Sequence, residues 1–558
     1  MGCTSLTRLM GPGGAPGAEV TDTPKTLAYF HYLKAQRLLL ADDAAGATEE
    51  YEEALKEDPE SAPLETELAA IYQRLGEVKK ALAHVEKAIK LDPAQQEAYF
   101  ILAGLHVGLN QLEEAIQEYE HILSLDPENR EARLFLATLY AQQRRFPQAI
   151  HTIQELLRLE PKSVVGYYYL GRFYLEMDQV SEAKTEFHRA LTLDPQFTPA
   201  MFDLGLALEK EKHYSQAMNI YRRILRRFPN NPRAWANIGR LFLMSKRLGE
   251  AQRAFQKVKE LEKNDTAAFF HIGLIYLEQK FPENAILEFR TILNHPRYKD
   301  RARYYLALAL EEKGDLKAAA WEYQLVGRDS EQFIPARLRM AYLYYQLKDK
   351  EQAYRILNEL RNLDPDREEI YLTISYFYEE DSLWDRAIAI LEEALEKVPK
   401  PAEIHFRLAV LYDKKKDREE SIAHIKKVLE LEPDNPDAQN FLGYTYAEAG
   451  IQLDEAERLI RAALRAKPDS GHILDSLGWV FYKKGQYDKA VVELERASRI
   501  MPQDGTVAEH LGDAYFQQKR YQEALRIYRR AQALENANPS ELRKKIIHTE
   551  QLLGESAL

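Results

Sequence analysis

Apolar and small residues recur along this chain at a spacing of 34 residues. One copy of the pattern reads DSLGWVFYKKGQYDKAVVELERA, from Asp475 to Ala497, and variants of it occupy nearly the whole sequence. In all copies but one, a small residue is followed twelve positions later by a second small residue. The spacing predicts two helices per copy. The small residues let these helices approach closely, while large apolar residues fill the space between hairpins.

The two small positions hold Ala, Gly or Ser in all fifteen copies, over residues 35–512 for the first position and 47–524 for the second. One extra residue between Gly450 and Ala456 lengthens a single copy to 35 residues. Nine copies carry a tyrosine three positions after the first small residue. We interpret these rings as core residues: Tyr72, Tyr140, Tyr174, Tyr276, Tyr344, Tyr378, Tyr412, Tyr446 and Tyr515.

Prolines mark the ends of the copies, often in a helix-ending context such as LxLDP. They fall every 34 residues from Pro59 to Pro229 and resume at Pro365, after a gap of four periods. The register therefore persists where the proline is lost. A proline at this place stops one helix and begins the turn into the next.

Small, aromatic and proline positions at this period resemble the tetratricopeptide repeat, a helix-turn-helix unit. The resemblance covers residues 28–537 as fifteen tandem repeats. It implies an all-α fold, a right-handed superhelix (an α-solenoid), in which the first helix of each hairpin lines a concave face. Because each hairpin buries its apolar side only against its neighbours, repetition produces a long curved surface.

The two ends of the chain are expected to differ from the repeats. Residues 538–558 are predicted to form a capping helix and tail. Asn538 suits the N-cap, Pro539 the first helical position, and Glu541 a capping-box spacing. Residues 1–27 are interpreted as a flexible tether because they are rich in Gly and Pro. Four apolar residues are expected to cover the last edge of the core: Leu542, Ile546, Ile547 and Leu553.

Composition narrows the classes of partner and site. The net charge of −12 argues against nucleic acid, because phosphate binding needs a face rich in lysine and arginine. The single cysteine, Cys3, excludes disulfides within the chain and metal sites built from several thiolates. No apolar run approaches the roughly 20 residues that a membrane-spanning helix needs.

The sequence contains no recognisable catalytic, nucleotide-binding or metal-binding motif. The fourteen histidines are scattered singly through the repeats, without partners at ligand spacing. Fifteen repeats and a cap leave no room for a separate catalytic domain. We therefore expect a non-enzymatic protein without cofactor or metal. An enzyme acting through an unrecognised site is the alternative.

The repeat register predicts that a series of aromatic and arginine residues on the first helices points toward the concave face. Aromatic rings offer stiff, amphipathic contact area of the kind that binding surfaces favour. The alternative is that these rings pack between neighbouring helices. The candidate groove residues are Tyr168, Arg172, Phe202, Arg240, Phe270, Tyr304, Tyr342, Tyr345, Tyr376, Phe406, Tyr444, Trp479, Tyr482 and Phe516.

One segment near each end of the chain resembles a known type of bacterial sequence. Cys3 follows Gly2, and GCTSL looks like the end of a bacterial lipobox, so Cys3 is a candidate lipidation site; a lone buried or free cysteine is the alternative. The stretch from Asn440 to Ala531 resembles the end of a group of bacterial tetratricopeptide lipoproteins. That group includes the outer-membrane partner of a carboxy-terminal processing protease, which delivers cell-wall hydrolases to it. The match runs through Gly443, Tyr444, Asp475, Ser476, Leu477, Gly478, Trp479 and Tyr482.

These resemblances imply a scaffold that binds partner proteins or peptides in its aromatic groove. They favour an adaptor for an envelope protease, tethered through Cys3 to the periplasmic face of the outer membrane; without lipidation, a cytoplasmic location is expected. An assembly factor for a pilus, secretion or polysaccharide-export machine is the alternative within the same class.

Overall fold

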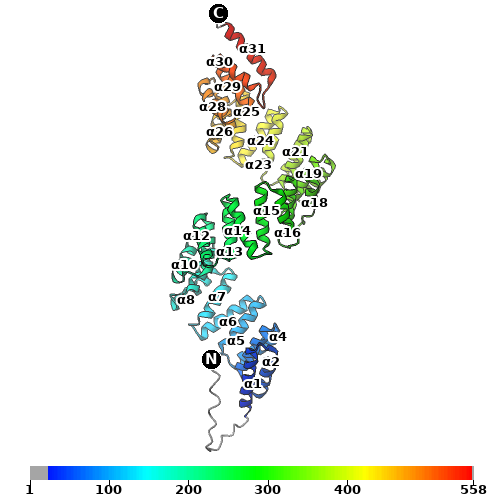
Figure 1. Cartoon of the computed structure of the whole chain (residues 1–558). Coiled ribbons are helices and arrows are strands. Elements are labelled where there is room, and N and C mark those ends of the chain that lie inside the picture. The colour runs from blue at the N-terminus through cyan, green and yellow to red at the C-terminus, as the bar shows by residue number, and fades with distance from the viewer. Residues whose placement is uncertain (1–22, 556–558) are drawn as a thin grey trace, which may run out of the picture. The chain divides into compact units, whose positions relative to one another are not determined.

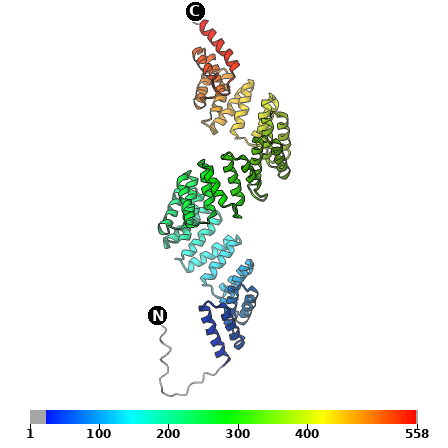
Figure 2. The ribbon, with the colours of Figure 1, turned by 45° about the vertical axis from the view of Figure 1, so that its right-hand side comes forward.

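The computed structural model describes residues 23–555 and forms two compact units, one up to Ala268 and one from Phe269 onward. Over those residues it contains thirty-one α-helices and no strand (Figures 1 and 2). Thirty helices pair into fifteen hairpins; odd-numbered helices up to α29 are the first helices of hairpins, and even-numbered ones the second helices. This confirms the all-α solenoid that the 34-residue pattern predicts.

The helices of the first unit are α1 (Pro24–Leu40), α2 (Ala44–Glu57), α3 (Ala62–Arg74), α4 (Val78–Leu91), α5 (Gln96–Gly108), α6 (Leu112–Leu125), α7 (Arg130–Gln142), α8 (Phe146–Leu159), α9 (Val164–Glu176), α10 (Val180–Leu193), α11 (Thr198–Lys210), α12 (Tyr214–Arg227), α13 (Pro232–Met244) and α14 (Leu248–Leu261). Helix α15 (Thr266–Glu278) contains the division between the units.

The second unit continues with α16 (Pro282–Thr291), α17 (Lys299–Glu312), α18 (Leu316–Gln324), α19 (Phe333–Gln346), α20 (Lys350–Leu363), α21 (Glu368–Glu380), α22 (Trp384–Leu395), α23 (Ala402–Lys414), α24 (Arg418–Leu431), α25 (Pro436–Ala449), α26 (Leu453–Ala466), α27 (Gly471–Lys483), α28 (Tyr487–Ile500), α29 (Gly505–Gln517), α30 (Tyr521–Ala531) and α31 (Pro539–Glu555).

Within each unit the first helices lie on the inner side of the stack. Neighbouring first helices contact one another, as α7 and α9 do in the first unit and α25 and α27 in the second. Over the described residues, neighbouring second helices show no comparable contact. Helices that lie closer together mark the concave side of a curved stack. The first helices therefore form the concave face of each unit, as the resemblance implies.

The first small residue of a hairpin lies beneath a large side chain of the second helix. In seven hairpins that residue is glycine, and an added Cβ would lie 2.5–2.8 Å from the large side chain. Gly205 faces Tyr221, and Gly512 faces Tyr528. The close approach of the two helices thus depends on the missing side chain.

The tyrosines interpreted as core residues lie at the interfaces between hairpins. Four of them, Tyr72, Tyr140, Tyr446 and Tyr515, are buried, and the other five are half-buried. Their hydroxyls explain the partial exposure. The Tyr412 hydroxyl, for example, donates to Glu392 Oε1 of the preceding second helix at 2.9 Å. The rings pack as predicted, while the polar tip reaches the edge of the interface.

The ends of the repeat array differ in detail from the expectation. Helix α1 begins at Pro24, with Thr23 as its N-cap, so residues 24–27 are helical and do not belong to a tether. The rest of the proposed tether, including Cys3, lies outside the described residues. At the other end, Leu542 is fully buried and Ile546 packs on the core, as expected, whereas Ile547 is 49% exposed.

Two second helices of the second unit are shorter than the repeat pattern suggests. Helices α16 and α18 have ten and nine residues, whereas α20 has fourteen. Both end early in copies where the expected proline is missing, at Arg297 and Glu331. The extra residue after Gly450 is accommodated in the turn before α26, where Gly450 and Gln452 both have positive φ.

Every turn between the two helices of a hairpin contains at least one residue with a positive φ, and the first such residue of each turn has a φ between 55° and 89°. Glycine, which adopts this conformation without steric cost, occupies only four of these fifteen positions. Lysine occupies six: Lys212, Lys246, Lys280, Lys348, Lys416 and Lys519. These lysines carry backbone strain that glycine would relieve.

Replacing Lys212 by glycine is therefore expected to raise the free energy of unfolding by about 1 kcal/mol. Lys212 has a φ of 62° at the turn after α11. The matched control is Lys79→Gly, near the start of α4 and exposed, which is expected to lose about 1 kcal/mol because glycine weakens helices. Urea unfolding followed by circular dichroism measures both, and a loss of stability in Lys212→Gly would contradict the strain argument.

Candidate binding groove

A cleft of about 480 Å³ in the second unit is lined by first helices and their N-caps alone. Four consecutive first helices contribute to it, α23, α25, α27 and α29. Because first helices form the concave face, the cleft lies where the sequence predicts a groove.

Three aromatic side chains form one wall of the cleft, Phe406 from α23 and Phe441 and Tyr444 from α25. All three are half-buried, and the ring centroids of Phe406 and Phe441 are 5.9 Å apart. Burial raises the pKa of the Tyr444 hydroxyl, which stays protonated and able to donate a hydrogen bond. This wall offers stiff apolar surface with one polar tip.

The carboxylates of the cleft already have partners in the chain. Asp437 accepts from Lys467 Nζ at 2.7 Å, and Asp475 lies 3.0 Å from Nδ1 of His510. Asp504 is the N-cap of α29 and accepts two backbone N–H groups at 2.9 and 3.0 Å. The cleft therefore contains acidic groups without presenting a strong uncompensated negative charge.

Asn440 is the polar side chain of the cleft that has an unused acceptor. It lies on α25, and within residues 23–555 its buried Oδ1 has no hydrogen-bond partner. A buried acceptor without a donor costs free energy that a ligand N–H can recover. With aromatic rings beside it, this oxygen suits the backbone N–H of an extended peptide.

Most of the predicted groove residues are half-buried on the first helices, where part of each side chain stays accessible. They come from both units and do not form one continuous site: Tyr168, Arg172, Arg240, Tyr304, Tyr342, Tyr345, Tyr376, Phe406, Tyr444, Tyr482 and Phe516. The rings of Tyr342 and Tyr376 stack across neighbouring helices at 5.6 Å. Of this set, only Phe406 and Tyr444 line the cleft described above.

Three predicted groove residues are buried, and their expected exposure is wrong. Phe202 and Phe270 are 5% and 2% exposed, and an arginine guanidinium covers each ring, Arg233 at 4.1 Å and Arg301 at 4.6 Å. Trp479 is 8% exposed. For these three residues the alternative interpretation, packing between neighbouring helices, is correct.

Trp479 is held by contacts that span three hairpins. Its indole Nε1 donates to Oε2 of Glu448 at 2.7 Å. Its ring stacks on His510 at a centroid distance of 4.0 Å and on Tyr482 at 4.7 Å. Trp479 therefore joins successive hairpins and offers little surface to a partner.

The two predicted groove arginines are occupied within the chain. Arg240 donates to Glu209 at 2.8 Å, and Arg172 lies 3.4 Å from Glu176 and 3.9 Å from Asp203. Both guanidinium groups are therefore engaged before a partner arrives. They stabilise the concave face of the first unit rather than offering a free cation.

The second unit uses the same arrangement to hold its first helices together. Glu311 accepts from the buried Tyr323 hydroxyl at 3.1 Å and from Arg339 of the next first helix at 2.9 Å. Two nitrogens of Arg407 donate to the two oxygens of Glu379, at 2.8 and 2.7 Å. Charged hydrogen bonds between neighbouring first helices stiffen the face that contains the cleft.

Sequence reasoning missed Asn440, Phe441 and His510 as residues of this region. A weak signal for Asn440 existed, because it lies three positions before Gly443, where Phe406 and the residues of six other copies are aromatic. His510 carried no such signal, because only the packed structure brings it beside Asp475.

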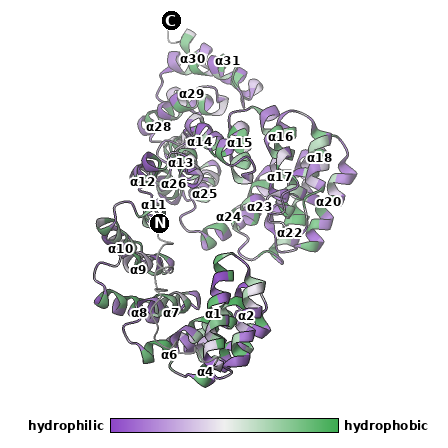
Figure 3. Cartoon of the chain, turned by 60° about the horizontal axis from the view of Figure 1, so that its bottom comes forward, coloured by the Kyte–Doolittle hydropathy of each residue, from purple (hydrophilic) through white to green (hydrophobic). Residues whose placement is uncertain are grey.

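Residues 23–555 contain neither a cluster of candidate metal ligands nor a membrane-spanning helix. No group of three or more histidine, cysteine or acidic side chains is placed to hold a metal ion. No helix in that part of the chain has the length and apolar character that a membrane span needs. Figure 3 shows hydrophilic and hydrophobic residues interspersed along the helices.

The hairpin stack and its cleft define a class of protein, the helical-repeat scaffold for protein–protein interaction. The chain belongs to the tetratricopeptide repeat family. One model of this repeat matches residues 66–130, 168–232, 270–332, 375–436, 452–505 and 476–539. Two further models of the repeat match residues 106–166, 207–270 and 415–477, and residues 335–367.

Known proteins and solved structures resemble the chain at modest identity. The TPR repeat-containing protein PA4667 of Pseudomonas aeruginosa is 26% identical over 188 residues, which is 34% of this chain and 32% of that protein. The chain thus matches about a third of that relative's length. The Cut9–Hcn1 structure is 14% identical over 94% of this chain and 98% of its own, with a TM-score of 0.41. MamA is 25% identical over 30% of this chain and 96% of its own, with a TM-score of 0.27.

Proposed function

We propose that this protein is a non-catalytic scaffold that binds an extended segment of a partner protein in the cleft of α23, α25, α27 and α29. The observation that supports this proposal most directly is the Oδ1 of Asn440, which lies beside the aromatic wall without a hydrogen-bond partner among the described residues. The acceptor suits a backbone N–H group, and the rings suit an apolar side chain of the same segment. Because the carboxylates of the cleft already have hydrogen-bond partners within the chain, shape and hydrogen bonding are expected to select the partner.

The proposal extends to an adaptor in the bacterial cell envelope, tethered through a lipid on Cys3 and serving a processing protease and cell-wall hydrolases. Its support is the GCTSL stretch and the resemblance of residues 440–531 to lipoproteins of that kind. An assembly factor for a pilus, secretion or export machine uses the same cleft and differs only in its partners.

Replacing Phe406 and Tyr444 together by alanine is expected to reduce partner recovery at least tenfold, because the aromatic wall is removed while helix-forming residues remain. The measurement is affinity capture of the tagged protein from its own membranes, read by quantitative mass spectrometry. The matched control is Trp321→Ala, which removes an aromatic ring that is 60% exposed on the second helix α18. Equal recovery by the double variant and the control would refute binding in this cleft.

The identity of the recovered partners separates the two roles. A processing protease recovered with cell-wall hydrolases supports the adaptor, and pilus or export components support the assembly factor. Assays against peptide, phosphoester and glycoside substrates are expected to show no turnover. Turnover that survives in the double variant would point to a catalytic site elsewhere.

A further inference from the structure

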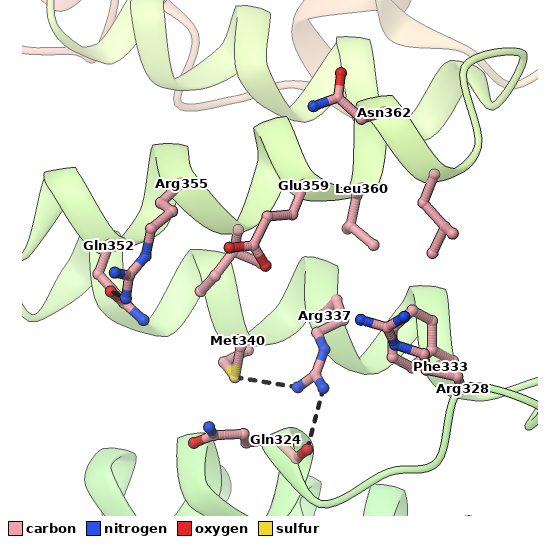
Figure 4. Close-up of a pocket in the computed structure, with 12 residues that line it drawn as sticks. Gln324, Arg328, Phe333, Arg337, Met340, Gln352, Arg355, Glu359, Leu360 and Asn362 are labelled. Atoms are coloured by element: carbon pink, nitrogen blue, oxygen red, sulfur yellow. Dashed lines mark hydrogen bonds between the residues drawn. The ribbon is translucent and has the colours of Figure 1, made fainter.

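A second cleft, of about 570 Å³, lies between helices α18, α19 and α20 of the second unit (Figure 4). Helix α18 ends after nine residues, and the loop of residues 325–332 replaces its last turn. The cleft lies beside this loop, and most of its lining residues belong to the second helix α20. It is therefore separate from the cleft of first helices described above.

Arg337 lies at the centre of this cleft without a carboxylate partner. In the preceding hairpin, Arg303 occupies the same repeat position and pairs with Glu322, nineteen residues later, at 3.1 Å. The residue nineteen positions after Arg337 is the apolar Ile356. The arginine is therefore present in both hairpins, whereas its ion-pair partner is present only in the preceding one.

The guanidinium of Arg337 instead bonds to uncharged groups. Nη2 donates to the carbonyl oxygen of Gln324 at 3.1 Å, and Nη1 lies 3.7 Å from Sδ of Met340. The group also stacks over Phe333, at 5.0 Å from the ring centroid. Figure 4 shows these contacts at the end of α18. Burial lowers the pKa of Arg337, but an arginine remains charged at physiological pH.

Two more arginines line the cleft, Arg328 from the loop and Arg355 from α20, and both are exposed. Over residues 23–555, none of the three arginines has a carboxylate within ion-pair distance. Glu359 of α20 is the one acidic side chain of the lining. The cleft therefore carries a net positive charge in a chain whose net charge is −12.

Apolar side chains line the rest of the cleft together with the uncharged polar side chains of Gln324, Gln352 and Asn362. Phe333 and Met340 of α19 and Ile356 and Leu360 of α20 are buried, and together they form a floor beneath the arginines. Leu363, which is 55% exposed, forms the rim. An occupant that satisfies both parts of the cleft carries an anionic group next to a large apolar side chain.

We infer that this cleft is a second docking site, which binds a short acidic segment of a partner protein with an apolar residue beside its carboxylates. Guanidinium groups bind carboxylates through paired hydrogen bonds, and the desolvated floor strengthens such contacts. A long polyanion or an anionic bilayer is disfavoured, because the chain as a whole is acidic and would repel it. The inference does not depend on the proposed use of the first-helix cleft.

To test this inference, the complete protein is used to select binders from a displayed library of random twelve-residue peptides. The affinity of the selected peptides is then measured by fluorescence anisotropy. The selected peptides are expected to carry Asp or Glu beside Leu, Phe or Met. Arg355→Glu and Arg328→Glu are each expected to weaken these peptides at least tenfold, since the new carboxylate repels them. Affinity is also expected to fall as salt rises.

The matched control is Arg418→Glu, which makes the same change in charge at an exposed position of α24 outside the cleft. It is expected to leave peptide affinity unchanged. Selection without acidic enrichment, or peptides that bind Arg355→Glu and the wild type equally, would overturn the inference. Binding to phosphatidylglycerol vesicles that is lost in Arg355→Glu, without peptide binding, would overturn it in favour of a lipid.

Discussion

Replacing Gly205 by alanine is expected to lower the free energy of unfolding by about 2 to 3 kcal/mol, because the added methyl group overpacks the hairpin of α11 and α12. An ideal Cβ at this position lies 2.5 Å from two ring carbons of Tyr221. Tyr221 is fully buried, and its hydroxyl donates to Glu209 at 2.7 Å, so the ring has no free direction in which to shift.

The measurement is urea unfolding followed by circular dichroism, with hydrogen exchange of α11 and α12 to locate the loss, because solenoids often unfold in parts. Gly249→Ala is the control in the same unit, since nothing lies within 4 Å of its Cβ position and alanine favours the helix. Adding Tyr221→Leu is expected to restore most of the stability, because another hairpin holds Ala341 and Leu357 at these two positions. An unchanged midpoint in Gly205→Ala would show that the helices separate easily.

Replacing Asp475 by alanine is expected to cost about 2 to 3 kcal/mol at pH 6, because it removes a charged hydrogen bond from a buried histidine. Asp475 is 7% exposed and His510 is 7% exposed, and the Asp475 Oδ1 to His510 Nδ1 distance is 3.0 Å. The ring of Trp479 covers His510 on one face. The remaining imidazole would be buried without its carboxylate.

This cost depends on pH with a defined sign. Burial alone lowers the pKa of His510, but the charge and hydrogen bond of Asp475, with smaller contributions from Asp513 and Glu448, raise it above its ordinary value. The stabilisation is therefore complete below the unfolded-state pKa of about 6.5 and is lost as pH rises through the higher folded-state pKa. The difference between wild type and Asp475→Ala should be largest near pH 6 and should shrink in alkaline buffer.

Two other histidines act in the opposite direction and do not affect this comparison. Burial lowers the pKa of His405 and of His424, so each destabilises the fold as pH falls below about 6.5, equally in both proteins. Asp469→Ala is the control, because Asp469 is exposed on the preceding loop. It should change stability by less than about 0.5 kcal/mol at every pH. A pH-independent cost in Asp475→Ala would contradict a charged pair.

The sequence alone predicted the hairpins, their number and their register, because each hairpin repeats the same local requirements. A small residue such as Gly205 has to lie beneath a large one, and a proline such as Pro229 ends a helix. These requirements involve residues within one repeat or its neighbour. They can therefore be read as spacing along the chain, and the solenoid follows from them.

Tertiary structure decided which side chains are available to a partner. Trp479 and Tyr444 share one repeat position, yet Trp479 is buried because His510 of the next first helix stacks on it. Tyr444 has no such neighbour and lines a cleft. The identity of the residue across the interface, rather than the position in the repeat, sets the exposure of each ring.

The second cleft, between α18, α19 and α20, could also be recognised only in the structure. The early end of α18 and the replacement of a glutamate by Ile356 are each ordinary substitutions in a repeat pattern. Packed together, they leave Arg337 at the centre of a cleft without a carboxylate within ion-pair distance. Periodic spacing determines where hairpins stack, because it records what all repeats share. Binding sites depend on the residues in which one repeat differs from the others. The effect of such a residue on a cleft is known only when the neighbouring helices are packed against it.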